Sequence, residues 1–145
     1  MGETKIVHSD AAGVEGIWWT LRIMFGVVPI VAGLDKFTNL LVHWDKYLAP
    51  FIPHVIGLRP QSLMYVVGVI EIVAGLLMLF TRWTKVWAWV VALWLWGIAI
   101  DLIIAGYYDV AVRDIVMGIS SFCLARLTAA PVRIESGAVS VASTR

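Results

Sequence analysis

The sequence has few charged residues and only one cysteine, and each scarcity excludes classes of protein. Charged residues make up 14% of the 145 positions, and the net charge is +1. A soluble domain averages about 25% charged residues. No basic run or acidic tail indicates a nucleic-acid partner. The lone Cys123 excludes an intrachain disulfide and a CxxC redox motif, and we interpret it as a small buried apolar residue.

Histidine is also rare, with three in the chain. His8 lies in a polar N-terminal stretch, and His43 and His54 lie between the first two long apolar segments, so none is in the middle of such a segment. This argues against a bis-histidine haem among the apolar segments and leaves ligation of a chlorophyll or haem by His43 or His54 as an alternative. No zinc, iron–sulfur, GxxxxGK, GxSxG or HExxH pattern is present. The sequence therefore contains no clear cofactor-binding motif.

Apolar residues are abundant, at 61% of the chain. A water-soluble core of this size could not bury so much apolar surface, so we expect a lipid bilayer as the solvent. A membrane span needs about 20 apolar residues, and in hydrocarbon each must be an α-helix. The segments that meet this length are 17–36, 62–80, 86–105 and 108–127. Short links at 81–85 and 106–107 predict an all-α, four-transmembrane-helix up-down bundle.

The connection between the first two spans is longer than the others. Its apolar residues recur at helical spacing, which predicts an interfacial helix; they are Leu40, Leu41, Trp44, Tyr47 and Leu48. The chain then divides into a polar N-terminal tail (1–16), a four-helix membrane domain (17–128) and a flexible C-terminal tail (129–145). The first stretch lacks the positive start and early apolar core of a signal peptide, so we expect no cleavage.

Lysine and arginine are distributed unequally between the two ends of the predicted bundle. With four spans, both termini share one side with the loop at 81–85, and that side carries six basic residues against four on the other. The positive-inside rule then predicts an inner (cell) membrane protein with both termini in the cytoplasm.

Two ionisable residues, Arg22 and Glu71, lie well inside predicted spans. A charged group at membrane depth costs at least about 2.5 kcal/mol and is usually paired or functional. Arg22 can extend its side chain to the headgroups, pair with Glu71, or contact a ligand. Glu71 is near the centre of its span. It is either a neutral side chain hydrogen-bonded across helices, or a site that carries a proton or binds a quinone.

A second group of charged residues lies toward the outer end of the bundle, on three different helices. Its members are Asp35, Lys36, Asp101, Arg113 and Asp114. These side chains predict an ion-pair network that joins the first, third and fourth spans. The alternative is a polar mouth for a substrate or a lipid headgroup.

Tryptophan is frequent, with eight in the chain. Tryptophans at the ends of spans belong to the interface belt. Trp94 and Trp96 lie too deep for that and on opposite faces of the third span. They are therefore candidates for contacts with another subunit or a pigment, with lipid-facing positions as the alternative.

Two stretches resemble one family of membrane proteins. The first span contains Arg22-x3-Gly26-x6-Gly33-x2-Lys36-Phe37, which resembles the opening helix of DoxX-like proteins. The second contains Glu71, then Ala74-Gly75, a leucine run and 81-TRW-83, which is similar to the family's Glu-x-x-Gly-Gly…Thr-Arg stretch. The sequence departs from it at Ala74, where a glycine is frequent in the family.

The resemblance implies a four-helix integral membrane protein with a shared signature of Arg22, Gly33, Lys36 and Glu71. It links the chain to thiosulfate:quinone oxidoreduction, terminal oxidase complexes and membrane redox assemblies. Three functions follow as hypotheses. The first is an accessory subunit of a respiratory or photosynthetic electron-transfer complex, embedded in the bilayer beside other membrane subunits and without its own redox cofactor. The second is a quinone-interacting subunit of a membrane oxidoreductase, with Arg22 and Glu71 at the quinone or proton site. The third is a small proton-coupled transporter.

Overall fold

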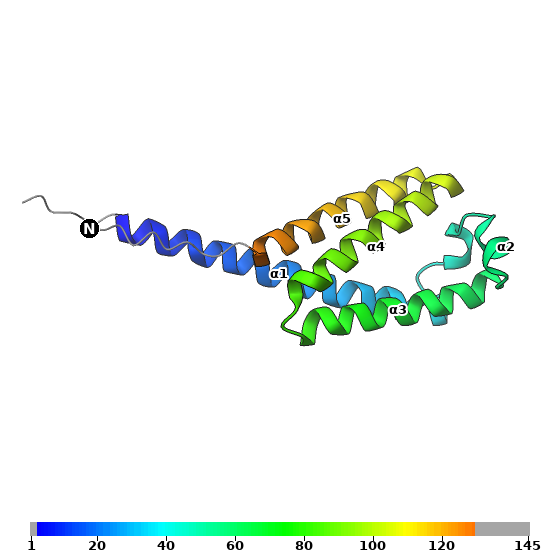
Figure 1. Ribbon diagram of the computed structural model, residues 1–145, viewed down its shortest axis with the longest axis horizontal. Coiled ribbons are helices and arrows are strands. Elements are labelled where there is room, and N and C mark those ends of the chain that lie inside the picture. Colours follow the sequence, from blue (N-terminus) through cyan, green and yellow to red (C-terminus); the bar gives the residue numbers. More distant parts are fainter. Residues whose placement is uncertain (1–2, 130–145) are drawn as a thin grey trace, which may run out of the picture.

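The computed structural model describes the backbone of residues 3–129 and the side chains of residues 12–129, and every regular element in that range is helical (Figure 1). This confirms the all-α prediction. In chain order the elements are α1 (Glu3–Thr38), η1 (Trp44–Tyr47), α2 (Ile52–Ile56), α3 (Pro60–Phe80), α4 (Thr84–Ala105) and α5 (Tyr108–Ala129). Three described helices are long and apolar enough to cross a membrane: α1 from Ala12 onward, α3 and α4. The fourth long helix, α5, is 22 residues long, as is α4.

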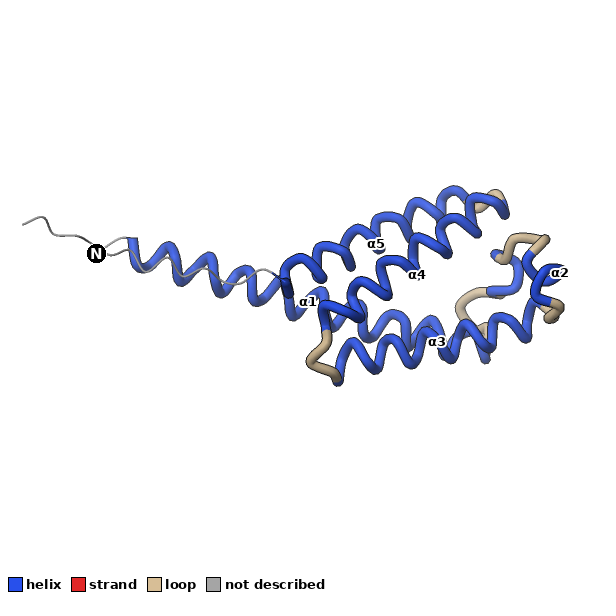
Figure 2. The backbone as a smooth tube through the Cα atoms, viewed as in Figure 1, coloured by secondary structure: helices blue, strands red, loops and turns tan. Residues whose placement is uncertain are grey.

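The four long helices form two pairs. Helix α1 packs along α3 and α4 packs along α5, whereas the contacts between the two pairs are few. Figure 2 shows the pairs close together at the α3–α4 turn and diverging toward the end where η1 and α2 lie. Short turns join α3 to α4 and α4 to α5, as the up-down prediction requires.

Glycines bring α1 and α3 into backbone contact. A Cβ atom on Gly33 would lie 2.6 Å from the carbonyl oxygen of Gly68, and one on Gly68 would lie 2.7 Å from that of Gly33. Gly75 faces the carbonyl of Gly26 about two turns further along in the same way. Small residues at such positions allow the close helix approach that holds membrane bundles together.

The α4–α5 pair is held by a stripe of small or polar residues on α5. Gly118 packs against the indole of Trp96, and Ser121 Oγ donates a hydrogen bond of 2.9 Å to the carbonyl of Ala88. Ala125 continues this buried stripe. Cys123 lies off the stripe and is exposed, so the prediction that it is buried was wrong. The helical period explains the difference, because positions 118, 121 and 125 share the face toward α4.

The predicted interfacial helix over residues 40–48 was largely wrong, because only the four-residue 3₁₀ turn η1 within it is helical. The short helix α2 follows beyond the predicted segment. Helix α1 ends where Asn39 adopts a left-handed backbone (φ 50°), after which the chain runs irregularly to η1. Leu40 and Leu41 are 83% and 70% exposed.

Helix α1 begins at Glu3, within the stretch that the sequence assigns to a polar tail, and projects beyond the other helices (Figure 1). It runs without interruption through Pro29. The predicted C-terminal tail lies outside the described residues except for Ala129.

Candidate functional site

A buried ion pair joins α1 to α3 in the membrane region. Lys36 Nζ lies 2.6 Å from Glu71 Oε2. The two residues are 3% and 8% exposed. Side chains of a helix lean toward its N-terminus, so Lys36, in the last turn of α1, extends back along α1 to the depth of Glu71. Ions at this depth are stable only when they are paired, and each of these residues supplies the partner of the other.

The loop after α1 covers the ion pair through Asp35 and Trp44. The Lys36 ammonium lies 3.8 Å from the centre of the Trp44 ring, a cation–π contact. Trp44 Nε1 donates a hydrogen bond of 2.7 Å to Asp35 Oδ2. The Asp35 carboxylate also accepts the backbone N–H groups of Leu40 and Leu41 at 2.9 Å and of Val42 at 3.3 Å. Asp35 therefore fixes the loop whose tryptophan covers Lys36.

A second carboxylate ties the same loop to the other helix pair. Asp101 Oδ1 on α4 accepts the backbone N–H of Ala49 at 3.0 Å. Nearby, the rings of Tyr47 and Tyr107 are 4.7 Å apart. The connection between α1 and α3 thus bridges the two helix pairs at the end where they diverge.

On its other side Glu71 borders a small cavity of about 40 Å³. Apolar side chains form most of its wall; the lining residues are Pro29, Ile70, Glu71, Ala74, Val90, Val91 and Trp94. The indole Nε1 of Trp94 is buried and has no hydrogen-bond partner among the described residues. A space of this size has room for about one water molecule, but the wall that faces it is apolar, and apolar cavities stay dry. The Glu71 carboxylate beside it remains paired with Lys36.

The expected network among the five outer charged residues is replaced by separate contacts. Asp35 and Asp101 accept backbone N–H groups of the loop, and Lys36 reaches inward to Glu71. The exposed Arg113 pairs with its own neighbour Asp114 at 3.0 Å. The physical reason is that the loop amides have no helical partners and need acceptors, which the two carboxylates provide.

Asp114 on α5 is 4% exposed, and Arg113 is its ion-pair partner among the described residues. The site itself therefore combines one buried cation from α1 with one buried carboxylate from α3.

Arg22 is separate from this site and does not pair with Glu71. Its guanidinium donates hydrogen bonds to the carbonyls of Met78 (3.1 Å), Leu79 (3.0 Å) and Thr81 (2.7 Å) at the C-terminal end of α3. The last carbonyls of a helix lack N–H partners and carry partial negative charge, which explains why they bind a cation. Sequence reasoning considered Glu71 as the partner of Arg22 and missed Lys36, although both Lys36 and Glu71 belong to the DoxX-like signature.

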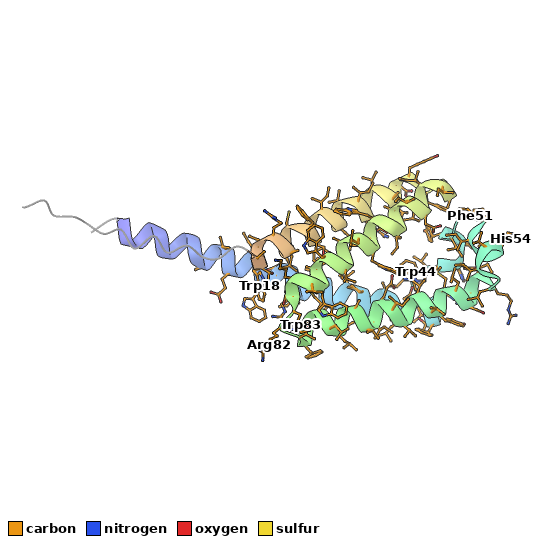
Figure 3. All side chains as sticks on the ribbon, in the orientation of Figure 1. Trp18, Trp44, Phe51, His54, Arg82 and Trp83 are labelled. Carbon is orange, nitrogen blue, oxygen red and sulfur yellow. The ribbon has the colours of Figure 1, made fainter. Side chains whose placement is uncertain are left out.

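The remaining candidates lie in two different places. Trp94 borders the cavity and Trp96 packs on Gly118, so both deep tryptophans make contacts within the bundle. His43 and His54 are exposed in the connection between α1 and α3, where His54 belongs to α2. Figure 3 shows His54 with Trp44 and Phe51 at the end of the molecule opposite Trp18, Arg82 and Trp83.

Comparison with known proteins identifies the family. The DoxX family model matches residues 17–105, more than half of the chain, so the chain belongs to the DoxX family and is a multi-pass membrane protein. The matched range contains α3, α4, most of α1 and both members of the Lys36–Glu71 pair, while α5 lies beyond it. The resemblance read from the sequence is confirmed. No similar curated protein and no similar solved structure was found.

Proposed function

We propose that the chain is an accessory subunit of an electron-transfer complex in the inner membrane, where it stabilises or docks other membrane subunits. The observation that carries this proposal is that the intramembrane charges are used in its own assembly. Lys36 binds Glu71, Arg22 binds the end of α3, and Asp35 and Asp101 bind the loop. Exposed apolar side chains on all four long helices can pack against lipid or neighbouring subunits.

The proposed orientation has both termini in the cytoplasm, which puts the α3–α4 turn with Arg82 and Lys85 on the cytoplasmic side. The Lys36–Glu71 pair then lies near the middle of the bilayer, and Lys36 reaches it from the outer end of α1. The electron-transfer assignment rests on the DoxX family and on the redox systems to which the family is linked.

Gentle purification tests the proposal. A tagged full-length chain is expressed in its native membrane, extracted in mild detergent without crosslinking, and analysed by native electrophoresis, mass spectrometry and absorbance. We expect co-migration with membrane subunits that carry redox cofactors. A single species containing this chain alone would contradict the proposal.

The cavity beside Glu71 favours a second candidate, a quinone-linked or proton-carrying role for this carboxylate. Trp94 and Glu71 border the same cavity, and a rearrangement that exposed Trp94 Nε1 and the Glu71 carboxylate would present a donor and a proton carrier to one bound group. The cavity of about 40 Å³ is far smaller than the sites of about 300–1,000 Å³ that hold drug-sized ligands, so quinone binding would require the two helix pairs to move apart.

A double substitution separates the two candidates. Replacing the ion pair by apolar residues, in Lys36→Met with Glu71→Met, removes the proton-carrying group but leaves no unpaired buried charge. An accessory subunit should still assemble, and the complex should keep its electron-transfer rate. Loss of quinone reduction in a complex that is fully assembled would favour the second candidate.

A further inference from the structure

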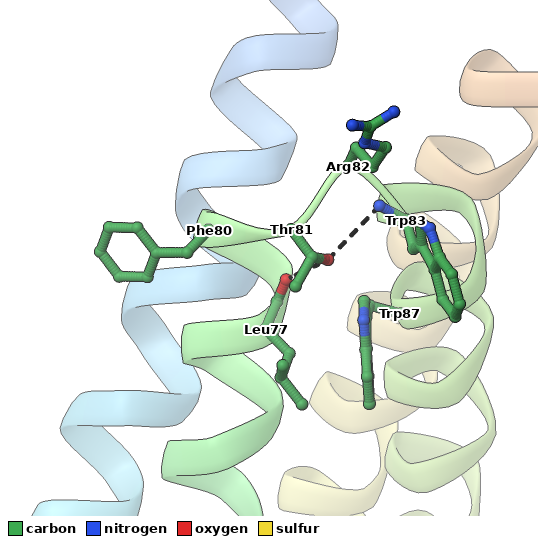
Figure 4. A pocket seen from close by; sticks show the side chains of 6 residues that line it. All are labelled: Leu77, Phe80, Thr81, Arg82, Trp83 and Trp87. Atoms are coloured by element: carbon green, nitrogen blue, oxygen red, sulfur yellow. Dashed lines mark hydrogen bonds between the residues drawn. The ribbon is translucent and has the colours of Figure 1, made fainter.

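A groove opens at the turn between α3 and α4, at the end of the molecule opposite the ion pair (Figure 4). Its volume is about 500 Å³. It is lined by residues from the end of α3, the turn and the first turn of α4, namely Leu77, Phe80, Thr81, Arg82, Trp83 and Trp87. Because two membrane-spanning helices end there, the groove lies at the boundary between hydrocarbon and headgroups.

The lining of the groove is apolar toward the bilayer interior and polar toward its surface, and a phospholipid has the same order of acyl chains and headgroup. Leu77 lies one turn deeper along α3 than the turn residues, on the side of the acyl chains. Trp83 and Trp87 rise on the opposite wall, where amphipathic indole rings suit the interface. Arg82 lies in the turn and points away from the helices. A basic side chain at the end of two membrane-spanning helices reaches the headgroups.

The charge at the rim is positive and is not neutralised by the side chains of residues 12–129. Arg82 and Lys85 are exposed and form no ion pair with them. The sequence contains no acidic residue between Glu71 and Asp101. Arg22, by contrast, is occupied by the carbonyls at the end of α3, including that of Thr81. Of these two available cations, Arg82 is the one that lines the groove.

We propose that this groove binds one anionic phospholipid from the surrounding leaflet. The phosphate and headgroup lie against Arg82, the glycerol region lies between Trp83 and Thr81, and an acyl chain continues past Trp87 and Leu77. A guanidinium binds a phosphate through paired hydrogen bonds. A zwitterionic lipid has the same phosphate, but its cationic headgroup lowers the net attraction to Arg82. The site is independent of the Lys36–Glu71 pair and of the proposed role as a subunit.

Native mass spectrometry of the full-length chain in mild detergent tests the proposal. The chain is titrated with dioleoyl phosphatidylglycerol and, separately, with dioleoyl phosphatidylcholine. We expect the wild type to prefer the anionic lipid by about fivefold, the effect of roughly one basic residue near a lipid phosphate. Arg82→Gln should abolish this preference. Arg126→Gln is the matched control, because Arg126 is exposed in the last turn of α5 and lies outside the groove.

Two further measurements distinguish a membrane lipid from a free phosphate ion and locate the bound lipid. Added inorganic phosphate should not displace the lipid, because a free anion gains nothing from the apolar wall. Phosphatidylglycerol with brominated acyl chains should quench less tryptophan fluorescence in Trp83→Phe than in Trp19→Phe, an exposed tryptophan of α1 outside the groove. Equal retention of both lipids by the wild type, equal behaviour of Arg82→Gln and Arg126→Gln, or displacement by phosphate would each overturn the proposal.

Discussion

Lys36 Nζ lies 2.6 Å from Glu71 Oε2, and this contact connects the end of α1 to the middle of α3. It lies one helical turn from the place where Gly33 and Gly68 bring the two backbones together. Close packing and charge pairing therefore act on the same helix pair. The first prediction concerns how much the pair stabilises the bundle.

Removing one partner should cost more than removing both. Lys36→Met leaves the buried Glu71 carboxylate unpaired, and such a loss typically costs about 3–5 kcal/mol. The double variant Lys36→Met with Glu71→Met should recover most of this stability. Reversible unfolding in mixed detergent and SDS micelles measures the free energy of unfolding, with Lys46→Met, at an exposed lysine of η1, as the control. A double variant less stable than Lys36→Met would show that the pair has another role.

Glycine-to-alanine substitutions should lower the free energy of unfolding at the α1–α3 interface but not on the lipid-facing surface. In Gly33→Ala the new Cβ would lie 2.6 Å from the Gly68 carbonyl oxygen and 2.8 Å from Ile72, so the helices must move apart. Overpacking of this kind costs about 1–3 kcal/mol. Gly97→Ala on α4 meets nothing within 4 Å and should be neutral or stabilise by up to about 1 kcal/mol, the difference in helix propensity. The same unfolding assay measures both, and equal effects would argue against backbone contact between α1 and α3.

Asp35→Asn should release the loop that covers Lys36. The amide keeps one carbonyl oxygen in place of the two carboxylate oxygens that accept N–H groups from the loop and from Trp44. Hydrogen exchange of the backbone amides of Leu40, Leu41 and Val42, followed in detergent by mass spectrometry, should become faster. Asp45→Asn is the control, since the Asp45 side chain has no hydrogen bond with the described residues. Unchanged protection in Asp35→Asn would mean that other contacts hold the loop.

Arg22→Lys should weaken the attachment of α1 to the end of α3 although the charge is kept. The guanidinium donates to three carbonyls from two of its nitrogens, and an ammonium cannot reproduce that planar arrangement. Because hydrogen bonds from charged groups contribute about 1.5–3 kcal/mol, we expect a loss in the free energy of unfolding of about that size. Arg126→Lys, on the surface of α5, should change it little. Equal stability of Arg22→Lys and the wild type would indicate that Arg22 extends to the lipid headgroups instead of holding the end of α3.

Much of the fold could be predicted because hydrophobicity and length are properties of the sequence alone. Long apolar segments must be helical in hydrocarbon, and short connections make neighbours antiparallel. The predicted spans 62–80 and 86–105 end where α3 and α4 end, and each helix begins two residues earlier than predicted. The C-terminal boundary of α1 was expected near Lys36 and lies at Thr38.

The partners of the buried charges could not be predicted in the same way. Sequence reasoning grouped the charged residues by depth and therefore predicted that Asp35, Lys36 and Asp101 would bind one another. Depth along a span follows from counting residues, whereas a side-chain partner also depends on the rotation of each helix and on nearby loop amides. Asp35 and Asp101 bind such amides, which no periodicity in the spans reveals.

The sequence by itself determined that this chain is a helical membrane protein of the DoxX family, because composition, span length and the signature residues need no partner to be recognised. Only the tertiary structure decided that α1 pairs with α3 and α4 with α5, that Lys36 neutralises Glu71, and that Arg22 binds the end of α3. The physical reason is that an ion in hydrocarbon must find a counter-charge or a free backbone group within a few ångströms. Which group lies within that reach is set by the packing of helices that are distant in sequence.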